Sequence, residues 1–145
     1  MDGIIKEMTK GIDLPEVFTP IKVKELYRLA YSLYRDKHYA DASYFFRILL
    51  AANPRRAKYW KGLGACLQMI GEHRPALNCY VLCQTLNLEQ PDPYLFIHAA
   101  DCYFALGEVE PGLKALDAAN LAAQEKMDTQ VINHVKLLKE LWSKR

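Results

Sequence analysis

The sequence lacks an excess of charge of either sign, and it lacks any long apolar run. Its 19 basic and 17 acidic residues leave a net charge of +2 over 145 residues, which gives no electrostatic case for binding nucleic acid. No apolar run approaches the roughly 20 residues of a membrane span, and the first residues are not the basic start of a secretion signal. We therefore expect a cytosolic protein that neither binds nucleic acid nor inserts into a membrane.

The sequence also lacks the groups that catalysis would need. It contains no catalytic triad and no phosphate-binding loop. Gly62, Gly64 and Gly71 are close together, but they fall inside or at the end of a predicted helix, whereas a nucleotide-binding loop joins a strand to a helix. We therefore expect no enzyme, no catalytic residue and no cofactor.

An internal repeat with a period of 34 residues is the dominant pattern that is present. Residues 57–90 match a tetratricopeptide unit, which is a pair of antiparallel helices, at Trp60, Leu63, Gly64, Gly71, Ala76 and Tyr80. Gly64 and Ala76 are small where the two helix axes approach within about 8–10 Å. Gly71 is predicted to end the first helix, because glycine accepts the positive φ of a C′ position.

The same pattern recurs on both sides of this unit. Residues 23–56 form one further copy, with helices predicted over residues 20–35 and 39–52, and residues 93–126 form another. A single unit cannot bury its apolar face alone, so roughly three stacked units are the minimum for a stable array. The chain has that minimum.

These patterns predict an all-α fold of three tetratricopeptide-like hairpins in a right-handed superhelix. Asp128 can cap a final helix whose apolar residues share one face, and we interpret that helix as a C-terminal lid. The expected single domain (1–145) comprises an N-terminal arm (1–22), three repeats (23–56, 57–90 and 93–126) and the C-terminal capping helix (127–145).

The four cysteines invite a metal or disulfide interpretation. Cys79 and Cys83 are one helical turn apart, and so are His98 and Cys102. A zinc site would need facing helices to bring such ligands together, whereas Cys66 and Cys102 occupy the same internal position of successive repeats. We therefore predict reduced thiols that pack between helices, and no metal.

The N-terminal arm is apolar but does not belong to the repeat. Its apolar side chains are Ile4, Ile5, Met8, Val17 and Phe18. Two interpretations stay open. The arm folds back as a cap on the first repeat, or it packs on another copy of the chain.

The first helix of each repeat is predicted to line an inner, concave surface. Positions 2, 5, 9 and 12 of a repeat lie opposite the stripe that packs on its second helix. These positions hold Lys24, Tyr27, Tyr31 and Tyr34 in the first repeat, Lys58, Lys61, Ala65 and Gln68 in the second, and Tyr94, Ile97, Asp101 and Phe104 in the third. Such a surface offers apolar area and hydroxyl donors together, which suits a bound peptide. In the alternative interpretation the tyrosines only pack against one another.

The residues also carry a family resemblance. The segments Gly62–Cys66 with Gly71, and His98–Cys102 with Gly107, resemble the second and third repeats of the class II chaperones of bacterial type III secretion. Tyr27, Tyr31 and Tyr34 are similar to that family's tyrosine stripe, and the likeness spans roughly residues 14–123. It implies a bacterial cytosolic chaperone that holds an extended segment of hydrophobic translocator proteins in the predicted groove.

Two family features carry over less directly. Members form homodimers through the N-terminal region, which implies Ile4, Ile5, Met8, Val17 and Phe18 as the matching apolar positions, although the arm does not match by motif. Some members also act with a transcription activator, which these residues do not decide.

The competing functions are other kinds of binding module. A tetratricopeptide co-chaperone would bind an acidic C-terminal tail through a site that resembles a carboxylate clamp of Lys, Asn and Arg side chains. The corresponding places in this chain hold Tyr27, Tyr31, Gly62, Tyr94 and His98. A generic protein–protein interaction scaffold is the remaining alternative, and it would be favoured if the chain's own N-terminal arm filled the groove.

Overall fold

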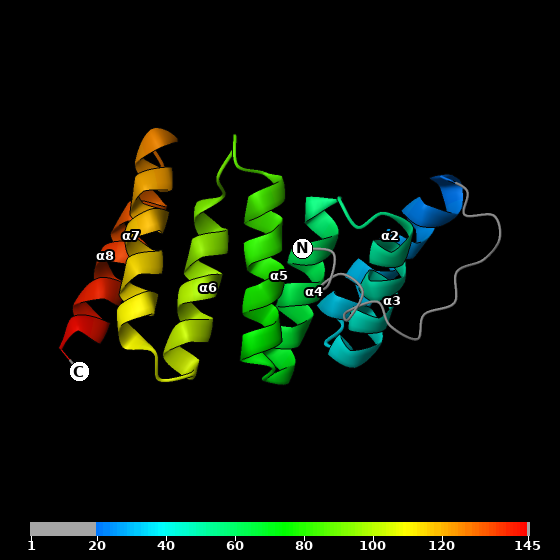
Figure 1. Ribbon diagram of the computed structural model, residues 1–145, viewed down its shortest axis with the longest axis horizontal. Helices are drawn as coiled ribbons and strands as arrows, with labels where there is room; N and C mark the ends of the chain where they lie inside the picture. The colour runs from blue at the N-terminus through cyan, green and yellow to red at the C-terminus, as the bar shows by residue number, and fades with distance from the viewer. Residues whose placement is uncertain (1–19, 145) are drawn as a thin grey trace. The chain divides into compact units, whose positions relative to one another are not determined.

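The computed structural model describes residues 20–144, and this part of the chain is helical without strands. The helices are α2 (Pro20–Arg35), α3 (Tyr39–Ala52), α4 (Ala57–Ile70), α5 (His73–Leu86), α6 (Pro93–Ala105), α7 (Val109–Glu125) and α8 (Thr129–Ser143). They fall into two compact units, with α2 to α5 in the first and α6 to α8 in the second (Figure 1). The predicted all-α, tetratricopeptide-like class is confirmed. The handedness of a superhelix and the single-domain boundaries stay predictions.

The helices begin and end where the sequence places the signals. Gly71 adopts φ 96° at the end of α4, and its N–H donates to the Gln68 carbonyl at 3.1 Å. The Asp128 carboxylate accepts from the Val131 N–H at 3.2 Å and caps α8, as predicted. A further cap at Asp92 accepts from the Tyr94 N–H at 2.9 Å and opens α6.

Glycines set the closest contacts between helices. A Cβ on Gly62 of α4 would lie 2.4 Å from the Phe46 ring of α3, and a Cβ on Gly64 would lie 2.7 Å from the Tyr80 ring of α5. Both distances are shorter than any van der Waals contact allows. Aromatic rings therefore occupy the space that a side chain would take, and the prediction that Gly64 is small where helices approach is confirmed.

The core of the first unit is centred on Trp60. Its side chain is fully buried, and its Nε1–H donates to the Pro54 carbonyl at 2.7 Å, so the one polar atom of the indole is satisfied. Leu63, one turn further along α4, is also buried. The corresponding Leu29 of α2 is 42% exposed, because α2 packs chiefly along α3 among the described helices.

The core of the second unit joins all three of its helices. Ile97 and Phe104 of α6 are buried together with Leu116 of α7 and Val135 of α8. The Trp142 ring of α8 stacks on Phe104, with centroids 4.2 Å apart and planes at 10°. The helix α8 therefore covers this unit as the lid that the sequence predicts.

The four cysteines are buried free thiols. Burial raises the pKa of Cys66 and of Cys102 to about 12. Burial also raises the pKa of Cys79, and the neighbouring Cys83 and Cys66 add to that shift. Protonated thiols in apolar surroundings are poor nucleophiles, so they act as small packing groups, as predicted.

Replacing Gly62 by alanine tests the contact between helices. In an exposed helix this substitution stabilises by about 0.5–1 kcal/mol, but here the new methyl group would overlap the buried Phe46 ring. We expect a loss of about 1–3 kcal/mol in the free energy of unfolding, the usual cost of overpacking. Urea unfolding measures it, and a stabilised variant would contradict the contact.

The thiols predict a dependence of stability on high pH. In the folded chain Cys66 and Cys102 keep their protons up to a pKa of about 12, whereas the ordinary thiol value is 9.0. The unfolded chain then releases protons that the folded chain holds, so stability falls as pH rises from about 9 towards 12. Urea unfolding at several pH values should show a shallower fall for the double variant Cys66→Ala, Cys102→Ala. Equal slopes would show that other groups carry the effect.

Candidate functional site

Three tyrosines form a continuous row of rings along α2. Tyr27, Tyr31 and Tyr34 are spaced i, i+4 and i+7, which places them on one helical face. The ring centroids lie 6.1 Å apart for Tyr27 and Tyr31, and 6.5 Å apart for Tyr31 and Tyr34. Tyr31 is 50% exposed, and the other two are half-buried. We call these three residues the tyrosine row.

Both ends of the tyrosine row are anchored by other rings. Tyr27 meets the buried Phe46 of α3 edge-on at 6.1 Å and Tyr59 of α4 at 5.7 Å. Tyr34 meets Tyr39 at the start of α3 at 5.4 Å. The two end tyrosines therefore pack on one side, and the middle one stands free of the core. Tyr31 contacts the rings of Tyr27 and Tyr34 and still leaves half of its surface exposed.

Cations lie against the same rings. Lys58 Nζ is 4.2 Å from the centroid of Tyr27, and the Arg35 guanidinium is 5.8 Å from the centroid of Tyr31. Desolvation lowers the pKa of Lys58, and the nearby positive charges of Arg56 and Lys24 lower it further. Such cation–π contacts hold the long side chains over the rings. The row consequently has positive groups next to it that can bind carboxylates or backbone carbonyls.

Burial raises the pKa of the Tyr27 and Tyr34 hydroxyl groups, and neighbouring tyrosines add to both shifts. Both phenols therefore stay protonated at neutral pH and above. They can donate hydrogen bonds to a bound chain.

The first helix of the second repeat adds a polar wall to the first unit. Lys58 is exposed, while Lys61, Ala65 and Gln68 are half-buried. The Gln68 side-chain oxygen accepts from the Tyr80 hydroxyl at 2.6 Å, which fixes its amide. The predicted site residues of the first two repeats are thus all at least partly accessible.

The predicted site residues of the third repeat divide into two pairs. Tyr94 is 47% exposed, and Asp101 is exposed as well. Ile97 and Phe104 are only 5% and 6% exposed, so the expectation that they face an open groove is wrong. The cause is α8, because Val131, Val135 and Trp142 pack over them.

The carboxylate of Asp101 is perturbed by its surroundings. Desolvation raises its pKa, and His98 and His134 act in the opposite direction. In the described part of the chain, no group of His, Cys, Asp and Glu side chains could hold a metal ion. The predicted dimer residues, Ile4, Ile5, Met8, Val17 and Phe18, lie outside the described residues.

Known proteins resemble the chain over most of its length, although no protein-family model matches it. It is 27% identical over 128 residues to the low calcium response locus protein H of Yersinia pestis, in a match that covers 82% of this chain and 74% of that protein. A type III secretion complex from Aeromonas hydrophila contains a similar chain, with 26% identity, a TM-score of 0.80 and coverage of 87% and 83%.

A third likeness is to the type III secretion chaperone SycD of Yersinia enterocolitica, solved in complex with a peptide of the translocator YopD. It has 26% identity and a TM-score of 0.70, and the match covers 86% of this chain and 99% of that one. In sequence and fold the chain is similar to the class II chaperones of type III secretion. Within residues 20–144, no helix has the length and apolar character of a membrane span.

Sequence reasoning missed one part of this chain's surface. An open cavity of about 570 Å³ runs along α2 and is lined by Tyr27 and Tyr31 on one side and by Arg28, Ser32 and Arg35 on the other. The spacing of the three polar residues, i, i+4 and i+7, places them in a second row beside the tyrosines. That spacing is visible in the sequence and could have extended the predicted site.

Proposed function

We propose that this chain is a class II chaperone that binds an extended segment of hydrophobic translocator proteins on the tyrosine row and keeps them soluble and competent for secretion in the bacterial cytosol. The observation that carries the proposal is Tyr31, a large ring that is 50% exposed between two anchored tyrosines. SycD, which is similar in sequence and fold, is known in complex with a peptide of the translocator YopD.

The mechanism is sequestration rather than catalysis. Removing the apolar surface of a bound segment from water contributes roughly 25 cal/mol of favourable free energy per Å². This gain offsets the entropy lost when an unfolded chain is ordered. The tyrosine hydroxyls, Lys58 and Lys61 satisfy backbone carbonyls of the client. Because Tyr27 and Tyr34 are already held by neighbouring rings, little side-chain entropy is lost when a client binds.

Of the other residues predicted to contact the client, we retain those that are at least partly exposed. Ala65 and Gln68 extend the surface of the first unit, and Ala65 leaves room for a client side chain. Tyr94 and Asp101 are the exposed candidates of the second unit. Ile97 and Phe104 are withdrawn as contacts, because α8 covers them.

We also propose that the chaperone forms a homodimer through its N-terminal arm. The apolar set Ile4, Ile5, Met8, Val17 and Phe18 supplies the surface for it, and SycD has been solved as an alternative dimer. A generic tetratricopeptide scaffold remains the second candidate function. It differs in that its partner would not be a hydrophobic translocator.

Exchanging Tyr31 for alanine tests the client-binding surface. Coexpression with candidate hydrophobic secreted proteins identifies a client, and its chaperone-binding segment is then titrated by calorimetry. We expect Tyr31→Ala to weaken binding by about tenfold, which corresponds to about 1.4 kcal/mol for one exposed aromatic contact. Helicity and melting temperature should change little, because the ring does not belong to the core.

Tyr44 of α3 is a matched control. It is 51% exposed, almost the same as Tyr31, but it lies off the tyrosine row. Tyr44→Ala should leave client affinity unchanged. Equal losses in the two variants, or no loss in Tyr31→Ala, would refute the tyrosine row as the binding surface.

A further inference from the structure

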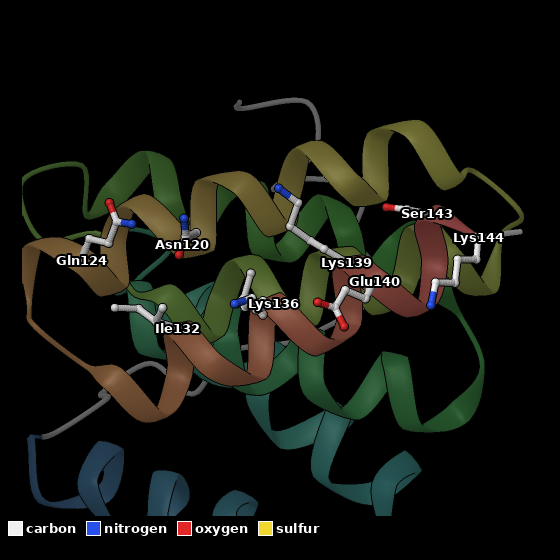
Figure 2. Close-up of a pocket in the computed structure, with 9 residues that line it drawn as sticks. Asn120, Gln124, Ile132, Lys136, Lys139, Glu140, Ser143 and Lys144 are labelled. Atoms are coloured by element: carbon white, nitrogen blue, oxygen red, sulfur yellow. The ribbon is translucent and has the colours of Figure 1, made fainter.

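A second open cavity lies within the second unit, between α7 and α8 (Figure 2). Its volume is about 540 Å³, within the range of about 300–1,000 Å³ that is typical of binding clefts. Asn120 and Gln124 of α7 form one wall, and residues of α8 form the other. Ile132 contributes partly exposed apolar surface, and Val135, which also lines the cavity, is buried in the core cluster on which Ile132 packs. We call this cavity the α7/α8 groove.

The α7/α8 groove lies on the face of α8 that a second helix would cover. Counted from the first residue of each helix, Ile132, Val135, Lys136 and Lys139 hold positions 4, 7, 8 and 11 of α8. In α4 the same positions hold Trp60, Leu63, Gly64 and Leu67, the stripe through which α4 packs on α5. Among the described residues no helix follows α8. The helix α8 thus has the register of the first helix of a hairpin.

The charge of the α7/α8 groove restricts what can fill it. Three lysines and one glutamate line it, of which Lys136, Lys139 and Glu140 are on α8 and Lys144 follows its last residue. Lys139 reaches towards α7 (Figure 2). Its Nζ lies 2.5 Å from a carboxylate oxygen of Asp117 of α7. Lys136 and Lys144 form no ion pair within residues 20–144. An occupant therefore needs an apolar face flanked by acidic side chains.

We propose that the α7/α8 groove binds an acidic amphipathic helix of another protein, which completes the fourth hairpin. A helix fits because adjacent hairpins bury their apolar stripes only against one another, and the acidic flank pairs with Lys136 and Lys144. A second copy of the chain fits poorly, because the same lysines would face each other. This binding site is separate from the tyrosine row, which lies in the other unit.

Two designed peptides test the proposal on the full chain. Both are short fluorescent helices with a leucine face, and the flank carries glutamates in one and lysines in the other. Fluorescence anisotropy should show that the glutamate peptide binds and the lysine peptide does not. In the variant Lys136→Glu, Lys144→Glu we expect the glutamate peptide to weaken by about tenfold or more, the equivalent of about 1.4 kcal/mol, and the lysine peptide to gain binding.

Control variants separate the α7/α8 groove from net charge and from the tyrosine row. Lys114→Glu, Lys126→Glu makes the same charge change on exposed lysines of α7 and its C-cap, which do not line the groove, and should leave peptide binding unchanged. Gln124→Trp places a bulky ring on the exposed α7 wall and should block the peptide while the helices stay folded by circular dichroism. Tyr31→Ala should not affect peptide binding, and the lysine reversals should not affect client binding.

Three results would overturn the proposal. The first is equal binding of the two peptides to the unmodified chain. The second is an undiminished affinity for the glutamate peptide in the Lys136→Glu, Lys144→Glu variant. The third is binding to phosphatidylglycerol vesicles that depends on Lys136 and Lys144 while the glutamate peptide fails to bind, which would assign the groove to a membrane surface.

Discussion

The packing of an aromatic ring onto a glycine of the neighbouring helix is the contact on which the structure depends. It occurs between Phe46 and Gly62 in the first unit and between Phe104 and Gly112 in the second. Because each glycine has no side chain, the ring lies directly against the helix and sets the distance between the two helices. The contact therefore also positions the side chains that pack on these rings, among them Tyr27 of the proposed binding surface.

The contact between ring and glycine has different surroundings in the two units. In the first unit Phe46 meets Tyr27 edge-on, so the buried ring supports one end of the tyrosine row and leaves Tyr31 in solvent. In the second unit Phe104 is covered by Trp142 of α8, so this ring is closed to a ligand. The same contact, an aromatic ring against a glycine, thus supports the proposed binding surface in the first unit and a covered core in the second.

Much of this could be predicted from the sequence, because local signals decide it. The positive φ of Gly71, the cap at Asp128 and the small residue at Gly64 each follow from the chemistry of one side chain and its immediate neighbours. The exposure of Tyr31 also follows from helical spacing. The burial of Ile97 and Phe104 does not, because it depends on how α8 packs across α6, and the repeat pattern contains no information about a helix that departs from it.

The departure of α8 from the repeat has a physical reason that links stability to binding. A helix at the end of an array must bury one face and solvate the other, and α8 does so with Val131 and Val135 inside and lysines outside. The lysines at positions 8 and 11 replace the small and apolar residues found in α4, so another repeat of the same sequence could not pack there. The proposal that a helix with negative charge fills the α7/α8 groove follows from this replacement, because its acidic side chains would pair with these lysines.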